Sequence, residues 1–466
     1  MITTPILDFV RNYAESGAVR MHMPGHKGAG PLGCEALDIT EIDGAGELYA
    51  TDGIIAESEK HASALFGAHT YYSCEGSSLA IRAMLALCQE ISPSMEGARA
   101  SAADGGVPRP VVLAGRNAHR AFLSAAALLD FDVAWLNPGP GEAYHSCAVS
   151  AKAVDEALAR LEGRCRAVYI TSPDYLGHVA DIEAIAGVCH RHGALLLVDN
   201  AHGAYLKFLP GGSRHPMDLG ADLCCDSAHK TLPALTGAAY LHAHSRLGLD
   251  PARVKGALAL FGSSSPSWLI LQSLDACNRY LQGFTEALAG FLPKLKALKS
   301  ALAAHGYALV GDEPMKLTVS ARPFGYTGDA LAERLAASGI ASEFHDPDYL
   351  TLMPAPANGE GGLARLKDAL LAIPRRPALA QSAPAYHAPF AAMSVRQAAF
   401  APRESLPAGA CLGRVLAAPA LNCPPCVPIA VCGEVIDGEV LERLRYYGVK
   451  RCEVVARPDV FSRLSR

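Results

Sequence analysis

Short apolar runs alternate with amphipathic stretches over much of the chain. An apolar run of about four to eight residues that ends in polar residues and glycine is typical of a buried strand in a parallel sheet. Strands that alternate with helical stretches of about 10 to 15 residues predict a mostly parallel sheet with right-handed crossovers. The expected strand and helix pairs are 71–73 with 77–90, 111–114 with 119–129, and 167–170 with 181–192.

Two further apolar runs end in chemically active side chains. Residues 194–198 and 221–225 predict strands, and the functional groups of open α/β sheets gather beyond the carboxyl ends of such strands. A single lysine or aspartate in that place is usually a solvated residue or a helix cap. Together, however, these groups are the equipment of a pyridoxal 5'-phosphate (PLP) site, where lysine forms a Schiff base, aspartate keeps the pyridine nitrogen protonated and serine holds phosphate. The residues that follow the two runs are Asp199, His202, Ser227, His229 and Lys230.

Short motifs stand in a fixed order along most of the chain. They occupy residues 21–27, 38–41, 75–78, 116–119, 171–177, 199–203, 227–232, 264–267, 273–275, 413–414, 424–425 and 433–434. This ordered set resembles the PLP-dependent decarboxylases of ornithine, lysine and arginine, in a shorter form that lacks an N-terminal wing domain. The resemblance implies the type I, aspartate-aminotransferase fold. That fold is α/β, with a mostly parallel, seven-stranded sheet flanked by helices and with smaller α+β C-terminal domains.

The patterns divide the chain into four expected parts. An amphipathic helix over 285–304 is expected to connect a large domain to a small one, whose elements are a strand at 316–319, a helix at 328–338 and an edge strand at 340–344. Residues 92–110, rich in Ser, Gly, Ala and Pro, predict a flexible surface insertion. The four parts are an N-terminal arm (1–50) whose Pro and Gly breaks disfavour helix, a PLP-binding large domain (51–300), a small α+β domain (301–375), and a linker with a C-terminal domain (376–466).

The resemblance assigns a role to each candidate catalytic residue. Lys230 would bond the cofactor, and Asp199 would lie against the pyridine nitrogen. His119 would lie over the ring face, with a helix cap or a core histidine as the alternative interpretation. His202 would orient Asp199 or touch the ring.

Phosphate requires hydrogen-bond donors, which a glycine-rich turn into a helix N-terminus can supply. Gly76, Ser77 and Ser78 open a predicted helix in this way, although two serines before a helix are also an ordinary cap. Ser227 and His229, in the loop that carries Lys230, are expected to be further donors. Ser264 or Ser265 would add another, because they match a segment that reaches the neighbouring subunit's phosphate in this family. The resemblance thus implies a homodimer or a higher homo-oligomer with shared active sites.

Four positions depart from the family pattern. Asn200 follows the ring aspartate where Glu is usual, and Glu75 precedes the phosphate-loop glycine where Asn is usual. Gly237 replaces a Gln near the lysine loop, and Asp174 stands where Thr is common. The lysine, the aspartate and the phosphate donors all remain, so these departures bear on substrate preference.

Composition narrows the class of protein further. Of 466 residues, 50% are hydrophobic, which permits about two or three domains with large cores. A net charge of −5 argues against a nucleic-acid binder. The absence of an apolar run of about 18 residues argues against a membrane span, and the N-terminus lacks the pattern of a signal peptide. The 14 cysteines suggest reduced, buried thiols in a cytoplasmic protein.

One cysteine motif permits a different chemistry. Cys423 and Cys426 form a C-x-x-C, with Cys432 nearby, which could bind zinc or act in redox reactions. A structural zinc needs four ligands, and the sequence has no paired second C-x-x-C. We therefore expect a structural turn here and no metal.

These observations together predict an amino-acid decarboxylase. The resemblance to shorter family members implies that it converts a basic amino acid, arginine before lysine and lysine before ornithine, into CO2 and an amine of the polyamine pathway. Glu343 and Asp346 are candidate partners for the distal cation of the substrate, by charge and placement only. The alternatives are another type I PLP enzyme (an aldolase, desulfurase or aminotransferase) and a non-catalytic PLP-binding regulator. No Arg for an aminotransferase's substrate carboxylate can be placed, and the intact Lys230 and Asp199 argue against a regulator.

Overall fold

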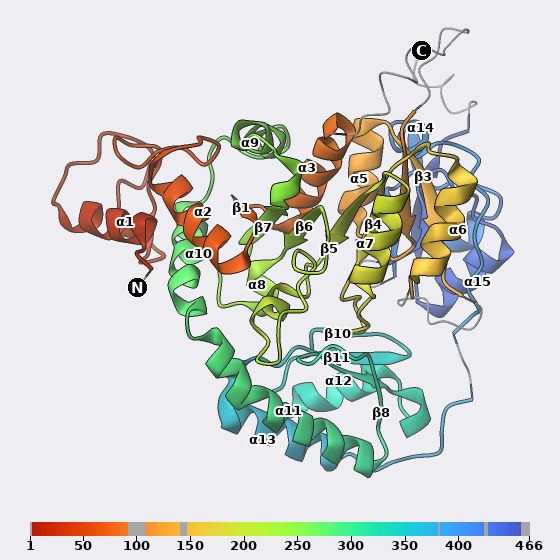
Figure 1. Cartoon of the computed structure of the whole chain (residues 1–466). Helices are drawn as coiled ribbons and strands as arrows, with labels where there is room; N and C mark the ends of the chain where they lie inside the picture. The colour runs from red at the N-terminus through yellow and green to blue at the C-terminus, as the bar shows by residue number, and fades with distance from the viewer. Residues whose placement is uncertain (1, 92–108, 140–146, 381–382, 424–426, 458–466) are drawn as a thin grey trace, which may run out of the picture. The chain divides into compact units, whose positions relative to one another are not determined.

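The computed structural model describes residues 2–91, 109–139, 147–380, 383–423 and 427–457. The chain divides into two compact units, of which the first contains residues 1–95, 166–168 and 181–289 and the second contains 96–165, 169–180 and 290–466. The largest sheet has seven strands in the order β1-β7-β6-β5-β4-β2-β3 (Figure 1), which confirms the expected α/β class. Its strands are β1 (His69–Ser73), β2 (Val111–Gly115), β3 (Asp132–Leu136), β4 (Cys165–Thr171), β5 (Leu195–Asp199), β6 (Leu223–Asp226) and β7 (Ala239–Ala243).

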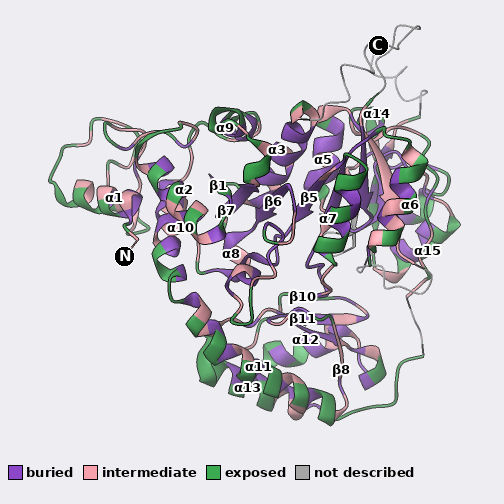
Figure 2. Cartoon of the chain, in the orientation of Figure 1, coloured by how far each residue is buried: buried purple, intermediate pink, exposed green. Residues whose placement is uncertain are grey.

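Three strands of the first unit consist almost entirely of buried residues. Strands β6 and β7 are buried at every residue, and β5 is buried at all but its first (Figure 2). β5 pairs with β6 in parallel, whereas β7 runs antiparallel to both β6 and β1. The helices of this unit are α1 (Pro5–Glu15), α2 (Gly53–Phe66), α3 (Gly76–Ile91), α7 (Ile182–Arg191), α8 (Ala228–Thr231), α9 (Pro251–Ala259) and α10 (Trp268–Leu281).

The N-terminal arm contains an α-helix that its Pro and Gly breaks had not suggested. Pro5 begins α1, a position where its fixed φ and its missing N–H cost nothing. The apolar side chains of Ile6, Leu7 and Val10 are buried. Oδ2 of Asp275 accepts hydrogen bonds from the N–H groups of Ile6 (2.9 Å) and Leu7 (3.0 Å), which satisfies two orphan donors of the first turn. The helix is therefore stabilised by a residue far away in the sequence.

The second unit carries a small antiparallel sheet with the strand order β10-β11-β9-β8. This arrangement of one short sheet and amphipathic helices is the expected α+β pattern, although the domain boundaries themselves stay a prediction. Strands β2 and β3 pair in parallel in the same unit. Its other elements are α5 (Arg120–Leu129), α6 (Ala151–Leu161), β8 (Ala308–Val310), β9 (Leu317–Ser320), α12 (Gly328–Ala337), β10 (Phe344–His345), β11 (Tyr349–Leu352) and α13 (Gly359–Leu371); α11 (Phe284–His305) begins in the first unit and ends in the second.

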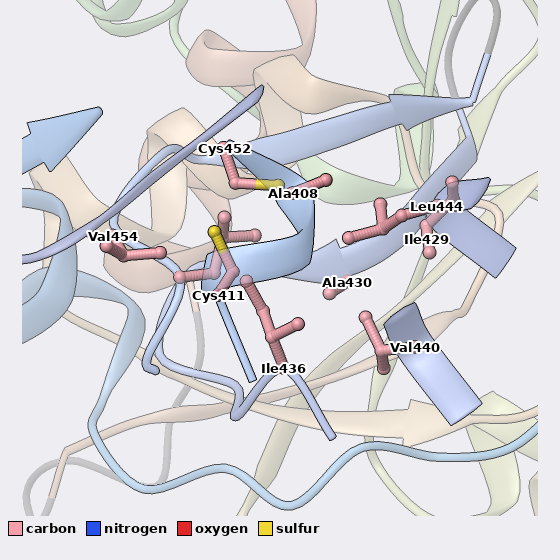
Figure 3. Close-up of a cluster of buried hydrophobic side chains, with 10 residues drawn as sticks. Ala408, Cys411, Ile429, Ala430, Ile436, Val440, Leu444, Cys452 and Val454 are labelled. Carbon is pink, nitrogen blue, oxygen red and sulfur yellow. The ribbon is translucent and has the colours of Figure 1, made fainter. Parts of the chain in front are cut away.

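The C-terminal part of the second unit has its own apolar core (Figure 3). β12 (Arg403–Pro407) pairs with β15 (Arg451–Val455), and β13 (Ala420–Cys423) pairs with β14 (Val427–Val431). This C-terminal part also contains helix α15 (Gly438–Tyr446) and the short helix α14 (Val395–Ala399). The core residues are Ala408, Cys411, Leu416, Ile429, Ala430, Ile436, Val440, Leu444, Cys452 and Val454.

Cysteines behave in this fold as small apolar residues. Among the cysteines whose side chains are described, all but Cys34 are buried, and all are free thiols. Cys426 lies outside the described residues, as does the side chain of Cys423, so the C-x-x-C prediction stays a prediction. The predicted insertion at 92–110 also falls almost wholly outside the described residues. Over the described part of the chain, none of the helices has the length and apolarity that crossing a membrane requires.

Candidate active site

The ends of β5 and β6 bring the predicted lysine and aspartate segments together. The two strands pair in register, with Asp199 opposite Cys225. Lys230 lies in α8, four residues beyond the end of β6, and its Nζ lies 3.2 Å from Nε2 of His202. A lysine ammonium can only donate, so this histidine nitrogen accepts when the lysine is charged. The contact between Lys230 and His202 fits the convergence predicted from the sequence.

Asp199 is a buried carboxylate with 2% of its surface exposed. Its Oδ1 accepts a hydrogen bond from the backbone N–H of Ala201 at 3.2 Å and faces Sγ of Cys225 at 3.7 Å. Burial raises the pKa of the Cys225 thiol well above its usual value, and the neighbouring Asp199 charge raises it further. Cys225 therefore remains a neutral donor to the Asp199 carboxylate.

The predicted phosphate donors come from two segments that meet at the start of α3. Gly76 begins this helix with φ +69°, a conformation that favours glycine. The buried hydroxyl of Ser227 donates to Oγ of Ser77 at 2.9 Å, and Ser78 lies half-buried in the same first turn. His229 follows in the lysine loop, with Nδ1 2.9 Å from the carbonyl of Ala238. The helix N-terminus and the lysine loop therefore present their donors together.

The backbone conformation at Gly237 and the space around it explain why glycine stands here in place of the family's usual Gln. Its φ is +98°, and its carbonyl accepts the N–H of Gly76 at 2.8 Å. A Cβ at this position would lie 2.9 Å from the carbonyl oxygen of Cys74 and 2.8 Å from the side chain of Ile270. A larger residue would have to move the backbone that joins the lysine loop to the start of α3.

Glu75 fixes the loop that contains the two predicted subunit-bridging serines. Its Oε1 accepts the N–H of Ser263 at 2.6 Å, next to Ser264 and Ser265, which are both exposed. Ser265 also lines a surface cavity of about 400 Å³. That cavity brings three of the sequence motifs together, since its other lining residues are Met23, Pro24, Gly25, Asp38, Ile39, Thr40, Glu41, Pro266 and Ser267.

His119 lies in the second unit as the N-cap of α5. Its Nδ1 accepts the N–H of Ala121 at 3.1 Å, which is the helix-capping arrangement named above as the alternative. The role of His119 over a cofactor ring stays a prediction.

Arg116, from the same motif as His119, forms a buried ion pair that the sequence did not reveal. Its guanidinium donates to both carboxylate oxygens of Glu434, at 2.7 and 2.8 Å, across 318 positions of sequence. Glu434 also accepts the N–H of Val431. Both members of the pair belonged to motifs noted in the sequence, but their pairing depends on the fold.

The turn at Asp174 explains a second departure from the family pattern, in which Thr is common at this position. Its Oδ1 accepts the backbone N–H groups of Leu176, Gly177 and His178 at 2.8–3.0 Å, and its Oδ2 lies 2.9 Å from Nδ1 of His178. The carboxylate therefore holds the turn closed, a role for which a threonine hydroxyl has fewer acceptor sites.

The two predicted substrate residues, both in the second unit, have different surroundings. Glu343 is exposed and accepts a hydrogen bond from the hydroxyl of Tyr175 at 3.0 Å. Asp346 is 1% exposed, and its Oδ1 accepts the N–H groups of Asp348 and Tyr349 in the β10–β11 turn. Burial raises the pKa of Asp346 to about 7. Glu343 is therefore the more accessible of the two carboxylates.

The sequence analysis missed a polar cluster directly beside the lysine loop. Asp226 is 0% exposed and ends β6, immediately before Ser227. Its Oδ2 lies 3.0 Å from Nε2 of His215 and 3.1 Å from Nε2 of His242, and its Oδ1 accepts the side-chain amide of Asn200 at 2.7 Å. Burial opposes ionisation of this carboxyl, but the two histidines outweigh it and hold the pKa of Asp226 well below its usual range.

The protonation of this cluster argues against a metal ion, although His215, Cys224 and Asp226 are close enough to one another to bind one. The backbone N–H of Met217 points at Nδ1 of His215 at 3.3 Å, so Nδ1 is an acceptor and Nε2 carries the proton that faces Asp226. A metal on Nε2 would move the proton to Nδ1, against that N–H. The cluster is therefore a hydrogen-bond network.

The donor set of the first unit fits PLP. The cofactor presents an aldehyde, a basic ring nitrogen and a phosphate. The unit offers an amine at Lys230, a buried carboxylate at Asp199, and hydroxyls from Ser77 and Ser227 at a helix N-terminus.

Comparisons with known proteins identify the family through a family model, with relatives and a solved structure beside it. A family model described as the major domain of Orn/Lys/Arg decarboxylases matches residues 4–290. An arginine decarboxylase from Halalkalibacterium halodurans is 28% identical over 474 residues, which cover 95% of this chain and 93% of that protein. An arginine decarboxylase from Bacillus subtilis is 27% identical, with 94% and 92% covered. The solved lysine decarboxylase of Francisella novicida shares the fold, with a TM-score of 0.76 at 16% identity over 98% of this chain and 81% of that one.

Proposed function

The chain belongs to the Orn/Lys/Arg decarboxylase family, and from that premise we propose that it converts arginine, in preference to lysine and then ornithine, into CO2 and the corresponding amine. The observation that carries the proposal is the pair of strand ends that hold Asp199 and Lys230 within one compact unit. The preference for arginine is supported by relatives named arginine decarboxylase that match over more than nine tenths of the chain.

PLP is the cofactor for which these residues are suited. When bound, it supplies an electron-accepting ring for the electron pair that remains when CO2 departs. Lys230 would be its point of covalent attachment, and the Asp199 carboxylate would hold a proton on the pyridine nitrogen. Ser77, Ser227 and the first N–H groups of α3 would bind the phosphate.

The histidine beside the lysine has a role in orientation. His202 is 5% exposed, and its Nε2 contacts Nζ of Lys230 at 3.2 Å. This contact restricts the lysine to the end of the sheet where Asp199 lies.

Within the second unit, Glu343 is the better candidate for the distal cation of the substrate. The hydroxyl of Tyr175 orients its carboxylate, which is exposed to solvent. Asp346 has its Oδ1 committed to two backbone N–H groups. We therefore expect Glu343→Gln to raise KM for arginine while leaving kcat much less affected, since the interaction is the same in the ground state and in the transition state.

The direct test of the reaction compares three substrates. Purified protein reconstituted with PLP is incubated with arginine, lysine and ornithine, and both CO2 and the amine are quantified. Equal amounts of the two products, with arginine the best substrate, are expected, and Lys230→Ala is the control that must abolish both. Amine-free turnover of these amino acids would contradict decarboxylation, and a lysine or ornithine preference would contradict the proposed order.

We also propose that two chains share each active site. Support comes from the exposed segment that contains Ser264 and Ser265, which resembles the segment lent between subunits in this family. Mixing inactive Lys230→Ala chains with inactive chains altered at both serines should restore partial activity, because one site of the mixed dimer has an intact lysine and intact serines. No recovery in isolated heterodimers would show that the serines serve their own subunit or none.

A further inference from the structure

Asn200 and Asp226 are adjacent to the two residues on which the proposed chemistry depends. Asn200 directly follows Asp199 at the end of β5, and Asp226 precedes the lysine loop at the end of β6. The strand register places Asp199 opposite Cys225 as the last pair of β5 and β6, and Asn200 and Asp226 are the next residue on each side. The backbone N–H of Asn200 donates to the carbonyl of Cys225 at 3.0 Å, and its side chain donates to Oδ1 of Asp226 at 2.7 Å.

We propose that Asn200 and Asp226 are positioning residues, which set the distance and orientation of the Asp199 carboxylate relative to the Lys230 amine. This inference rests on the proposed function of those two catalytic residues. The Asn200–Asp226 hydrogen bond is a side-chain link between the two strand ends, one residue beyond the last pair of β5 and β6. Its loss would leave the backbone bond from Asn200 to Cys225 and the contact between His202 and Lys230 to hold the two loops together.

The charge of Asp226 decides which residue is tolerated at position 200. Asp226 is ionised and fully buried, so it can only accept hydrogen bonds, and Asn200 is 0% exposed beside it. The donor is therefore the amide nitrogen of Asn200, while its Oδ1 has no hydrogen-bond partner among the described residues. An ionised carboxylate at position 200 would have no proton to donate to Asp226. It would also place a second anion within about one hydrogen-bond length of the Asp226 carboxylate.

The donors around Asp226 make the anion a fixed feature of the site. His215 and His242 each direct an Nε2–H group at Oδ2 of Asp226. His242 is also fully buried, and burial lowers its pKa, so it contributes a neutral donor. The negative charge of Asp226 therefore persists, and the amide at position 200 is the matching partner.

The test uses an isosteric exchange and its reversal. Asn200→Asp adds the second carboxylate without changing side-chain size, and the double variant Asn200→Asp/Asp226→Asn restores one acid and one amide with their positions exchanged. Asn278→Asp is the matched control, because Asn278 is also 0% exposed in the same unit and donates its amide to Tyr72 and to the backbone of Ser58.

Two properties are measured on cofactor-free protein. The first is the unfolding temperature. The second is the rate at which Lys230 captures PLP, followed by absorbance and assigned to that residue by borohydride reduction and peptide mapping. Neither measurement requires an amino-acid substrate, so the result is independent of whether the enzyme prefers arginine.

We expect Asn200→Asp to slow capture about 10- to 100-fold, the range that an ångström-scale displacement of a reacting group costs. The exchanged double variant should recover most of the rate. Asn278→Asp should lower the unfolding temperature but capture PLP at the rate of the parent. A parent-like rate in Asn200→Asp would overturn the inference. So would a double variant that regains the unfolding temperature while capture stays as slow as in the single variant.

A second variant keeps the test decisive if Asn200→Asp does not fold. Asn200→Ala removes the amide that donates to Asp226 without adding a second anion. Slower capture is again expected, and a parent-like rate would overturn the inference. Capture by Lys230→Ala at the parent rate would instead contradict the lysine assignment in the proposed function, so the two failures can be told apart.

Discussion

Each of the two units buries a carboxylate, and the two are stabilised in different ways. Glu434 in the second unit is 3% exposed and pairs with the Arg116 guanidinium, so the site carries no net charge. Asp226 in the first unit is 0% exposed and accepts hydrogen bonds from Asn200, His215 and His242. An ion pair tolerates neutral neighbours of many kinds, whereas a buried carboxylate held by hydrogen bonds requires a donor from each residue that touches it. At the protein surface, water would solvate the Asp226 carboxylate, and neighbouring residues would not need to be donors.

The largest expected effect comes from breaking the ion pair. Arg116→Met leaves the Glu434 carboxylate buried without its cation, and the loss of one partner of a buried pair costs about 3–5 kcal/mol. Urea unfolding of cofactor-free protein measures this. A loss below about 1 kcal/mol, as for surface pairs, would mean that water reaches Glu434 and that the two buried carboxylates differ less than their surroundings indicate.

Asp346, another buried carboxylate of the second unit, sharpens the comparison through pH. Because burial raises its pKa to about 7, the folded state keeps this proton after the unfolded state has lost it. Its contribution to stability is therefore complete below about pH 4 and declines as the pH rises to about 7. Asp346→Asn retains an acceptor for the two turn N–H groups and cannot ionise, so it should gain about 2–4 kcal/mol at pH 8 and nothing at pH 4. Equal unfolding free energies of parent and variant at pH 8 would contradict this.

A smaller loss is expected when one donor to Asp226 is removed. His242→Phe retains an aromatic ring next to Phe66, whose ring centroid lies 4.6 Å away, but removes one Nε2–H group. Hydrogen bonds to charged groups contribute about 1.5–3 kcal/mol, and His215 and Asn200 remain as donors, so a loss in that range is expected. Stability that does not change would show that two donors suffice for the buried anion.

The smallest effect is expected when both members of the ion pair become neutral. Arg116→Met combined with Glu434→Gln removes both charges and leaves an acceptor for the N–H of Val431. Since buried pairs can often be replaced by neutral groups without net loss, the double variant should lie within about 1 kcal/mol of the parent. A loss as large as that of Arg116→Met alone would show that the guanidinium stabilises the unit through something other than Glu434.

The elements that could be predicted from the sequence are those that local patterns determine. The apolar runs that became β5 and β6 end within one or two residues of the predicted positions, and α3 begins one residue before its predicted start. The meeting of Lys230 with His202 followed from the rule that functional groups gather at strand ends. The family resemblance supplied the roles of these residues, which physical patterns alone could not.

The contacts that could not be predicted join residues far apart in the sequence. Arg116 and Glu434 are 318 positions apart, and Asp275 lies 269 positions from the Ile6 N–H that it accepts. Asp226, His215 and His242 sit in segments whose local patterns give no sign of their meeting. Each of these polar groups is stabilised by a partner that only the tertiary fold brings near, so no window along the chain contains the necessary information.

The bond between Asn200 and Asp226 also limits how this enzyme can evolve. A single change of Asn200 to an acid creates two adjacent buried anions, whereas a change of Asp226 to an amide creates two neutral residues. The second intermediate is the milder one, because an amide can rotate to present either of its ends. A lineage that exchanges Asn200 for the Glu usual in its family should therefore lose the acid at position 226 first. The two positions are expected to covary among related sequences, in that order of substitution.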